Sequence, residues 1–339
     1  MKAVHMDGPG SFTVRDAAEP QADDLVLVRT KAAGICGTEL HILDAMIEPP
    51  WYPFVLGHEA AGVVEHVPDG VTGVSVGDRV AVYNFVGCGT CHWCRTGREE
   101  VCTAPKGQLG FSLDGTFRDV IPVPASCLVP LPDNVSFETG ALLSCSGMTA
   151  VHATRLAGVS LGQTVVVDGV GGVGLMVIQT AAAAGARVLA VSDTAEKGAL
   201  AREAGADDVI VLGPDGYDVV ADAIKERTGG AGADHFFELV GTTDSMRAGI
   251  RGLARHGTAM LIGYTTEELT IHPVELILSE TRIMSSVAAA RQDLETAVEL
   301  ASRGVLAAQI DTRYPIDDVG IGFDRLRNRA VNGRNVLVW

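Results

Sequence analysis

The sequence predicts an α/β protein of two domains, one mostly of β-strands and one built on a parallel sheet with helices on both faces. Three observations support this fold class. The chain has 339 residues, more than one hydrophobic core usually serves. Residues 1–147 contain short apolar runs broken by Gly and Pro, the pattern of an all-β segment. From Thr164 onward strand-like and helix-like runs alternate, which favours a doubly wound parallel sheet.

The elements follow from these patterns in chain order. In the first domain we expect strands such as 25–31, 61–66 and 79–83. In the second we expect a strand at 164–168, a Gly-rich turn, a helix to residue 184 and a strand at 187–192. Further units are expected as a helix at 199–204 and strands at 209–212, 233–240 and 257–264. The tail should hold a helix at 293–303, a short irregular segment and a strand at 335–339.

The composition favours a globular enzyme. Apolar residues make up 47% of the chain and charged residues 20%, which excludes a disordered or fibrous protein. A net charge of −16 disfavours nucleic acid and anionic membranes as partners. The start of the chain lacks the layout of a signal peptide, so we expect a cytoplasmic protein. Residues 169–186 carry no charge, but their Gly and Ala content is too weakly apolar for a transmembrane helix.

Four cysteines predict a structural metal site. Cys88, Cys91, Cys94 and Cys102 stand in the pattern C-x2-C-x2-C-x7-C, so four thiolates can converge on one ion from a single loop. Four sulfur ligands close a tetrahedral zinc site and leave no position for a substrate. The alternatives are unrelated or disulfide-paired cysteines, which a cytoplasmic setting disfavours, and a nucleic-acid-binding zinc ribbon, which the acidic charge disfavours.

A second, dispersed set predicts a catalytic zinc. Cys36 lies in Gly-Ile-Cys-Gly-Thr-Glu-Leu-His, His58 in Gly-His-Glu, and Cys145 in Ser-Cys-Ser-Gly-Met-Thr. A lone His or Cys is more often a core residue than a ligand. Together the three form a Cys2His set, which leaves a fourth position on zinc for water or an alcohol.

A Gly-rich turn predicts dinucleotide binding. Gly169, Gly171 and Gly174 satisfy the motif G-x-G-x-x-G, with Gly172 and Val173 in the two positions before the last glycine. The motif directly follows an expected strand and lies at the start of an expected helix. Such a turn allows backbone approach to a pyrophosphate, and the helix N-terminus attracts its charge. The following strand ends in Ser192-Asp193, and an acidic group there binds the ribose 2′-hydroxyl and repels a 2′-phosphate. We therefore expect NAD rather than NADP.

These motifs, in this order, resemble the zinc-dependent medium-chain alcohol dehydrogenases over essentially the whole chain. The resemblance implies a GroES-like catalytic zinc domain at 1–147 and 289–339 and a Rossmann domain at 148–288. It implies that Cys36, His58 and Cys145 bind the catalytic zinc, with Glu59 beside the metal and in some family members coordinating it. It further implies one catalytic and one structural zinc per chain.

The resemblance also implies roles for residues around these motifs. Thr38 matches the hydroxyl that accepts the proton of the alcohol, and His41 the end of the relay toward solvent. Lys197 matches a lysine common at the cofactor site, which aligns Ser192 with the usual Asp. Where this chain has Gly37 some members use a basic residue to hold the phosphates, and Arg334 is the candidate replacement. The family commonly has Asp where this chain has Glu39, so the support of the metal site can differ.

The implied function is the interconversion of an alcohol and its aldehyde or ketone by hydride transfer to or from NAD. A Cys at 145, where polyol dehydrogenases tend to carry Glu, favours simple apolar substrates, and Trp51, Phe85, Trp93, Phe111 and Met148 are candidate pocket residues. Two alternatives stay open: a polyol or sugar-alcohol dehydrogenase, and a catalytically silent protein that binds zinc and nucleotide. The expected partners are a small-molecule substrate and further copies of the chain in a tetramer or dimer, with 282–287 as the candidate edge strand.

Overall fold

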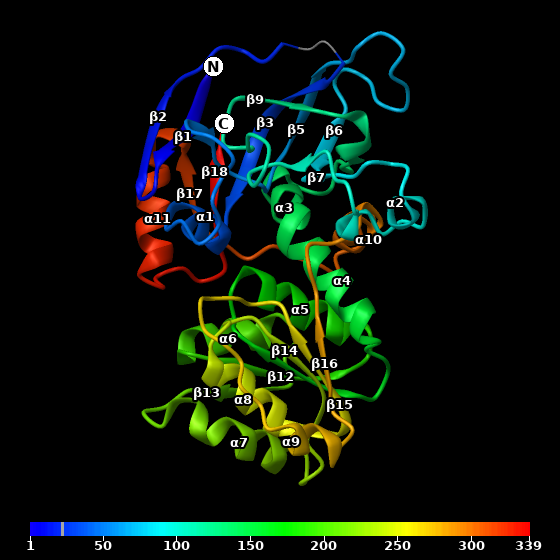
Figure 1. Ribbon diagram of the computed structural model, residues 1–339, viewed down its shortest axis with the longest axis vertical. Helices are drawn as coiled ribbons and strands as arrows, with labels where there is room; N and C mark the ends of the chain where they lie inside the picture. The colour runs from blue at the N-terminus through cyan, green and yellow to red at the C-terminus, as the bar shows by residue number, and fades with distance from the viewer. Residues whose placement is uncertain (22–23) are drawn as a thin grey trace. The chain divides into compact units, whose positions relative to one another are not determined.

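The computed structural model describes residues 1–21 and 24–339 and divides the chain into two compact units (Figure 1). Unit 1 comprises Met1–Met148 and Ala289–Trp339, and unit 2 comprises Thr149–Ala288. The chain thus leaves the first unit once and returns to it for its last 51 residues, since 339 − 288 = 51.

Unit 1 is built on a sheet in the order β10-β6-β5-β3-β18-β17, with β9 paired to β3. A small sheet β2-β1-β4 and a pair β7-β8 accompany it. The strands of unit 1 are β1 (Lys2–Gly8), β2 (Ser11–Asp16), β3 (Val26–Ile35), β4 (Phe54–Val55), β5 (Ala61–His66), β6 (Arg79–Val82), β7 (Phe85–Val86), β8 (Gly107–Gln108), β9 (Val120–Val123), β10 (Leu128–Pro130), β17 (Ile310–Pro315) and β18 (Arg334–Val338). Strand β3 alternates buried and half-buried residues over its first half, as a strand with one covered face should.

Unit 1 is mostly β-structure, as predicted, but short helices interrupt the all-β pattern expected for residues 1–147. The helical segments of unit 1 are α1 (Gly37–Leu43), α2 (His92–Arg95), α3 (Phe137–Leu142), a π-helical segment (Leu143–Gly147), α10 (Arg291–Ser302) and α11 (Val319–Arg327), with 3-10 turns at Glu99–Val101, Ala125–Cys127 and Ile316–Asp318. Those missed are about two turns or shorter, too short for a 3.6-residue apolar period to emerge. Helix α3 does carry a local signal, because the Ser136 side chain caps it by accepting from Thr139 N.

The tail contains more structure than expected. The segment between α10 and β18 was expected to be irregular, but it holds β17 and α11. Val319 and Phe323, one turn apart on α11, are buried in a core that also contains Ile35 and Phe54. This packing against residues far away in the sequence stabilises α11, which the local pattern with its two glycines does not reveal.

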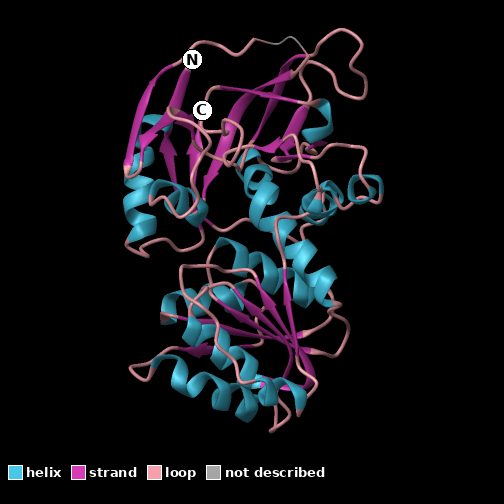
Figure 2. Ribbon diagram, in the orientation of Figure 1, coloured by secondary structure: helices cyan, strands magenta, loops and turns pink. Residues whose placement is uncertain are grey.

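Unit 2 is a parallel six-stranded sheet in the order β13-β12-β11-β14-β15-β16. Figure 2 shows its strands side by side with helices around them. Its strands are β11 (Thr164–Asp168), β12 (Arg187–Ser192), β13 (Asp208–Val211), β14 (Ala233–Glu238), β15 (Leu253–Leu261) and β16 (Arg282–Ser285). Its helices are α4 (Met148–Ala157, whose first residue belongs to unit 1), α5 (Gly172–Ala183), α6 (Ala195–Glu203), α7 (Val220–Arg227), α8 (Thr243–Gly252) and α9 (Pro273–Ile277), with a 3-10 turn at Gly216–Val219.

The strand order of unit 2 defines a ligand edge. The order reverses at β11, so the crevice at the carboxyl ends of β11 and β14 is the topological switch point, where doubly wound sheets bind their ligands. The three buried residues Val165, Val166 and Val167 make β11 the centre of the sheet. Within the described residues no helix is long and apolar enough to cross a membrane, and the uncharged run 169–186 folds as a turn followed by α5.

Candidate functional site

Two groups of possible ligand atoms converge, both in unit 1. Cys36, His58, Glu59 and Cys145 each offer one atom, and these four atoms lie within 4.8 Å of one another. The sulfur atoms of the second group also lie within 4.8 Å of one another, and this group consists of Cys88, Cys91, Cys94 and Cys102. The sets proposed from sequence are therefore each brought together in space, although their members lie up to 109 positions apart, since 145 − 36 = 109.

Cys36 stands at the junction of β3 and α1. It is the last extended residue before the helix and occupies the N-cap position. Glu39, in the first turn of α1, accepts from Cys36 N through Oε2 at 2.8 Å. This contact satisfies a backbone donor that the start of the helix would leave unpaired, and it holds the Cys36 backbone in place.

Glu39 also orients His58. Its Oε1 lies 2.6 Å from His58 Nδ1, and both side chains are buried. The other ring nitrogen, Nε2, lies 3.3 Å from Cys145 Sγ and so faces the cluster. Burial by itself lowers the pKa of His58, but the charge and hydrogen bond of Glu39 raise it well above its usual value. Glu39 thus fixes which nitrogen is directed at a metal, the role expected of a carboxylate behind a histidine ligand.

Glu59 is enclosed by a glycine and an arginine. A Cβ on Gly34 would lie 1.8 Å from Glu59 Oε2, so only glycine leaves room for this carboxylate. Arg334 Nη2 lies 3.0 Å from Glu59 Oε1, and the arginine is 5% exposed. Burial raises the pKa of Glu59 to about 8, although the Arg334 charge opposes the shift. Gly34 was not among the predicted site residues, and its signal in the sequence is its position two residues before Cys36.

Cys145 projects from the π-helical segment Leu143–Gly147. Such a widened turn recurs at functional sites because it re-aims one side chain out of the helical repeat. The Cys36 and Cys145 thiols form a hydrogen-bonded pair, which lowers the pKa of Cys36 and raises that of Cys145.

Thr38 and His41 lie on α1 beside the cluster. Thr38 Oγ1 is 3.7 Å from Cys36 Sγ, and His41 follows three residues later, on the same side of the helix. Both side chains are half-buried. They are therefore placed between the buried ligands and solvent.

The five candidate pocket residues come from different elements of unit 1, Phe85 from β7. Phe111 lies against His58 with ring centroids 5.4 Å apart, so it borders the cluster. Met148 is buried at the end of unit 1. Trp93 belongs to α2 in the four-cysteine loop, where its ring contacts His92. Trp51 is 45% exposed and packs on Phe54.

The four-cysteine loop is arranged to favour thiolates. Backbone N–H groups donate to three of its sulfurs, among them Cys91 N to Cys88 Sγ at 3.3 Å and Cys94 N to Cys91 Sγ at 3.5 Å. Such donors, first of all Thr90 N, lower the pKa of Cys88 to about 5. Desolvation raises that of Cys94 to about 12. These contacts fit a closed tetrahedral site for a metal that neutralises several thiolates.

The Gly-rich turn lies between β11 and α5. Gly169 has φ +104°, and a Cβ on Gly174 would lie 1.8 Å from Gly169 O, so both positions need glycine. Around Gly171 a Cβ would meet nothing within 4 Å. The 12-residue helix α5 begins at Gly172, with Val173 in its first turn. Its unpaired N–H groups and the open space at Gly171 suit a phosphate.

The end of β12 carries the next cofactor candidates. Ser192 is buried, and its hydroxyl donates to Thr194 O at 2.9 Å. Asp193 is exposed and pairs with Lys197 Nζ at 2.8 Å. Asp193 therefore presents a carboxylate at the ligand edge of the sheet, whereas Ser192 is engaged within the fold.

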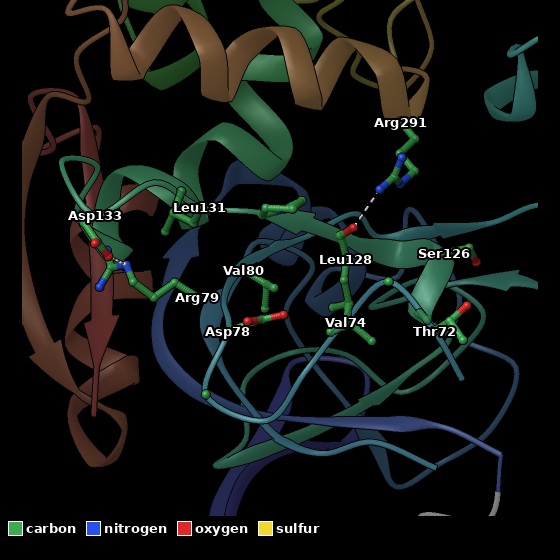
Figure 3. Close-up of a pocket in the computed structure, with 14 residues that line it drawn as sticks. Thr72, Val74, Asp78, Arg79, Val80, Ser126, Leu128, Leu131, Asp133 and Arg291 are labelled. Atoms are coloured by element: carbon green, nitrogen blue, oxygen red, sulfur yellow. Dashed lines mark hydrogen bonds and ion pairs between the residues drawn. The ribbon is translucent and has the colours of Figure 1, made fainter. Parts of the chain in front are cut away.

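A cavity of about 670 Å³ lies elsewhere in unit 1, bordered by the loop before β6, by β10 and by Arg291 (Figure 3). Arg291 Nη2 donates to Leu128 O at 2.8 Å across one side, and Arg79 faces Asp133 at 3.6 Å on another. None of the eight cluster residues lines it, so it is separate from both candidate metal sites.

Comparison with known proteins decides the family. Residues 22–133 match the model of the alcohol dehydrogenase GroES-like domain, and residues 172–303 match that of the zinc-binding dehydrogenases. An alcohol dehydrogenase of Geobacillus stearothermophilus is 35% identical over 92% of this chain and 91% of its own length. This chain belongs to the zinc-dependent medium-chain alcohol dehydrogenase family.

Two further relatives show the range of this family. The crystal structure of the alcohol dehydrogenase of Aeropyrum pernix has a TM-score of 0.93 and 29% identity, with 100% of both chains covered. An acryloyl-coenzyme A reductase of Metallosphaera sedula is 31% identical over 99% of each chain, and other relatives are NAD-dependent alcohol dehydrogenases. The chain is thus a zinc-type oxidoreductase with a GroES-like and a Rossmann-type domain.

Proposed function

We propose that this protein interconverts an apolar primary or secondary alcohol and its aldehyde or ketone, with one catalytic and one structural zinc and with NAD. The convergence of Cys36, His58 and Cys145 beside the Thr38 hydroxyl carries the proposal. Three such ligands leave one position on zinc for substrate. Unit 1 with its C-terminal return is then the catalytic domain, and unit 2 the nucleotide-binding domain.

The positions of the side chains support the catalytic roles that the resemblance implies. Zinc, when bound, supplies Lewis acidity that favours the ionised form of an alcohol hydroxyl. The Thr38 hydroxyl accepts the proton of that alcohol, and His41 delivers it to solvent. Glu39 keeps His58 Nε2 directed at the metal. Glu59 would be a further ligand of the metal, and in this structure its carboxylate forms an ion pair with Arg334.

The cofactor preference rests on the end of β12. Asp193 would accept from a ribose 2′-hydroxyl and would repel a 2′-phosphate, so NAD is preferred over NADP. Lys197 holds Asp193 in position. NAD, when bound, supplies the hydride acceptor. The Gly169–Gly174 turn would hold its pyrophosphate. Arg334, expected from the sequence to contact the phosphates, is buried against Glu59 in the candidate metal site, and its phosphate role stays a sequence-based expectation.

The substrate class rests on two side chains. Phe111 borders His58, and Cys145 occupies a position where a carboxylate would favour polyols. An apolar ring and a sulfur offer few hydrogen-bond partners to extra hydroxyl groups, so a polyol would lose hydration without compensation. We therefore place simple apolar alcohols and carbonyls above polyols.

The test is turnover by the zinc-loaded protein on a panel of carbonyl compounds. NADH oxidation is followed with aliphatic, aromatic and sugar-derived aldehydes and ketones, with NADPH in parallel. We expect apolar carbonyls to react, faster with NADH, and Cys36→Ser to lose at least about 100-fold in kcat/KM because a ligand is lost. Full turnover by folded Cys36→Ser would refute the site. Zinc and NADH binding without turnover of any compound would favour a silent protein.

A further inference from the structure

Two buried carboxyl groups face each other at the ligand edge of unit 2. Asp168 and Glu238 are the last residues of β11 and β14 and are partners in the parallel register. Asp168 is 1% exposed and Glu238 0%. Gly169, the first residue of the cofactor turn, directly follows Asp168. The pair therefore lies at the switch point, beneath the crevice where a dinucleotide binds.

Among the residues that the structure describes, no Lys or Arg neutralises the pair. Within the described part of the chain neither carboxylate forms an ion pair with Lys or Arg. The 3-10 turn before α7 contributes Tyr217, and α8 contributes Ser245. Beyond the end of β12, Asp193 already pairs with Lys197. Two buried carboxylates without a counter-charge repel each other, so one of them should hold a proton.

Hydrogen bonding distinguishes the two carboxyl groups. Glu238 Oε1 accepts from Val240 N at 3.0 Å, Gly241 N at 2.8 Å and Ser245 Oγ at 2.7 Å. Asp168 Oδ1 accepts from the Tyr217 hydroxyl at 3.2 Å, and the second oxygen of each group, Asp168 Oδ2 and Glu238 Oε2, has no hydrogen-bond partner. Because one donor contacts Asp168 and three contact Glu238, we assign the proton to Asp168. Burial, and then the Glu238 charge, raise the pKa of Asp168 to about 8.

We propose that Asp168 and Glu238 form a carboxyl pair that shares one proton, and that this proton is required for tight dinucleotide binding. The inference rests on unit 2 binding NAD, as proposed above. A second charge at Asp168 would lie one residue before the turn that receives the negative pyrophosphate. The same charge would also repel Glu238 on the neighbouring strand. At this point the two strand ends are joined by the hydrogen bond from Leu239 N to Asp168 O at 3.1 Å. Both effects weaken binding, because buried charges are poorly screened.

The sign of the pH dependence follows from this assignment. Below the pKa Asp168 is neutral and the dinucleotide binds tightly. As the pH rises through about 8 the group ionises and affinity falls. Because the bound state favours the proton, binding above that pH must take up a proton from solution.

The experiment measures NADH affinity of the intact protein by fluorescence between about pH 6.5 and about pH 9.5. The unaltered chain should lose affinity on the order of tenfold over this range, and Asp168→Asn should change less than about threefold. The control is Asp234→Asn, which replaces a carboxylate at the opposite end of β14, where Asp234 Oδ2 accepts from Thr164 N at 2.7 Å. It should retain the pH dependence of the unaltered chain.

A second variant and a second readout make the test independent of Asp168→Asn folding. Tyr217→Phe removes the one hydrogen bond that favours ionised Asp168, so the midpoint of the affinity loss should move to higher pH. Calorimetry in two buffers of different ionisation enthalpy should report uptake of about one proton per NADH near pH 9 and none near pH 6.5.

Three outcomes would overturn the inference. NADH affinity that is unchanged across the pH range refutes the role of the proton while leaving NAD binding intact. A pH dependence that persists in Asp168→Asn assigns it to another group. Absence of NADH binding at every pH refutes the proposed function and this inference with it.

Discussion

At the scale of the residue, one carboxylate supports two ligands of the candidate catalytic site. Glu39 contacts the backbone N of Cys36 and the ring of His58 at 2.8 Å and 2.6 Å, one oxygen for each. In Glu39→Gln only one side-chain oxygen remains to accept. We therefore expect zinc affinity at this site to fall roughly 10- to 100-fold, with the fold preserved. Zinc retained against a chelator series, followed together with circular dichroism, measures this.

The matched control for this prediction is Glu65→Gln, a surface carboxylate on β5 whose partner is Arg29 at 2.7 Å. Its loss removes one exposed ion pair and should leave zinc affinity unchanged. Equal zinc retention in Glu39→Gln and the unaltered chain would show that Glu39 does not support the metal. The family commonly has Asp at the position of Glu39. The longer Glu39 side chain reaches both Cys36 N and His58 Nδ1.

At the scale of the element, the four-cysteine loop contains little regular structure of its own. Between Gly87 and Cys102 it forms only α2, of four residues, and a 3-10 turn. Cys94→Ser should lower the zinc content from two equivalents per chain to one and destabilise the protein by about 3 kcal/mol, since a structural metal is lost. Metal analysis and thermal unfolding measure both quantities.

Cys127→Ala provides the comparison for the loop variant. Cys127 is buried outside both clusters, so this change should retain both zinc equivalents even though it leaves a small cavity. If Cys94→Ser also retained both, the loop would not be a structural zinc site.

At the scale of the whole molecule, unit 2 ends in an open sheet edge. Strand β16 is the last in the order and pairs only with β15, and Val287 just beyond it is 59% exposed. We expect the chain to form a dimer or tetramer by pairing this edge with that of another copy. Sedimentation should give a multiple of 35.4 kDa. Val287→Lys should weaken the assembly and raise its dissociation constant, because the lysines of two copies would face each other across the symmetry axis.

Leu161→Lys is the matched control for assembly. Leu161 is 84% exposed on unit 2 and lies outside the β16 edge, so its replacement should leave the sedimentation unchanged. A sedimenting mass of one chain for the unaltered protein would contradict the expected assembly.

The sequence by itself determined the features that local chemistry carries. The strands Ala61–His66, Thr164–Asp168 and Arg187–Ser192 have the predicted bounds, because short Val-rich runs favour strands over helices. The four-cysteine loop was equally readable, since its ligands lie within 15 residues. The dispersed set of Cys36, His58 and Cys145 has no such spacing, and it could be named because its residue types form a Cys2His set and its motifs resemble those of the family.

Only the tertiary structure decided what depends on distant parts of the chain. It brought Glu39 onto His58, placed Arg334 on Glu59 and required Gly34 to leave space for that carboxylate. It also paired Asp168 with Glu238, 70 positions away, since 238 − 168 = 70. No sequence spacing specifies such contacts. They arise because packing removes water from these groups, so that each buried charge must be matched by a partner that the fold alone selects.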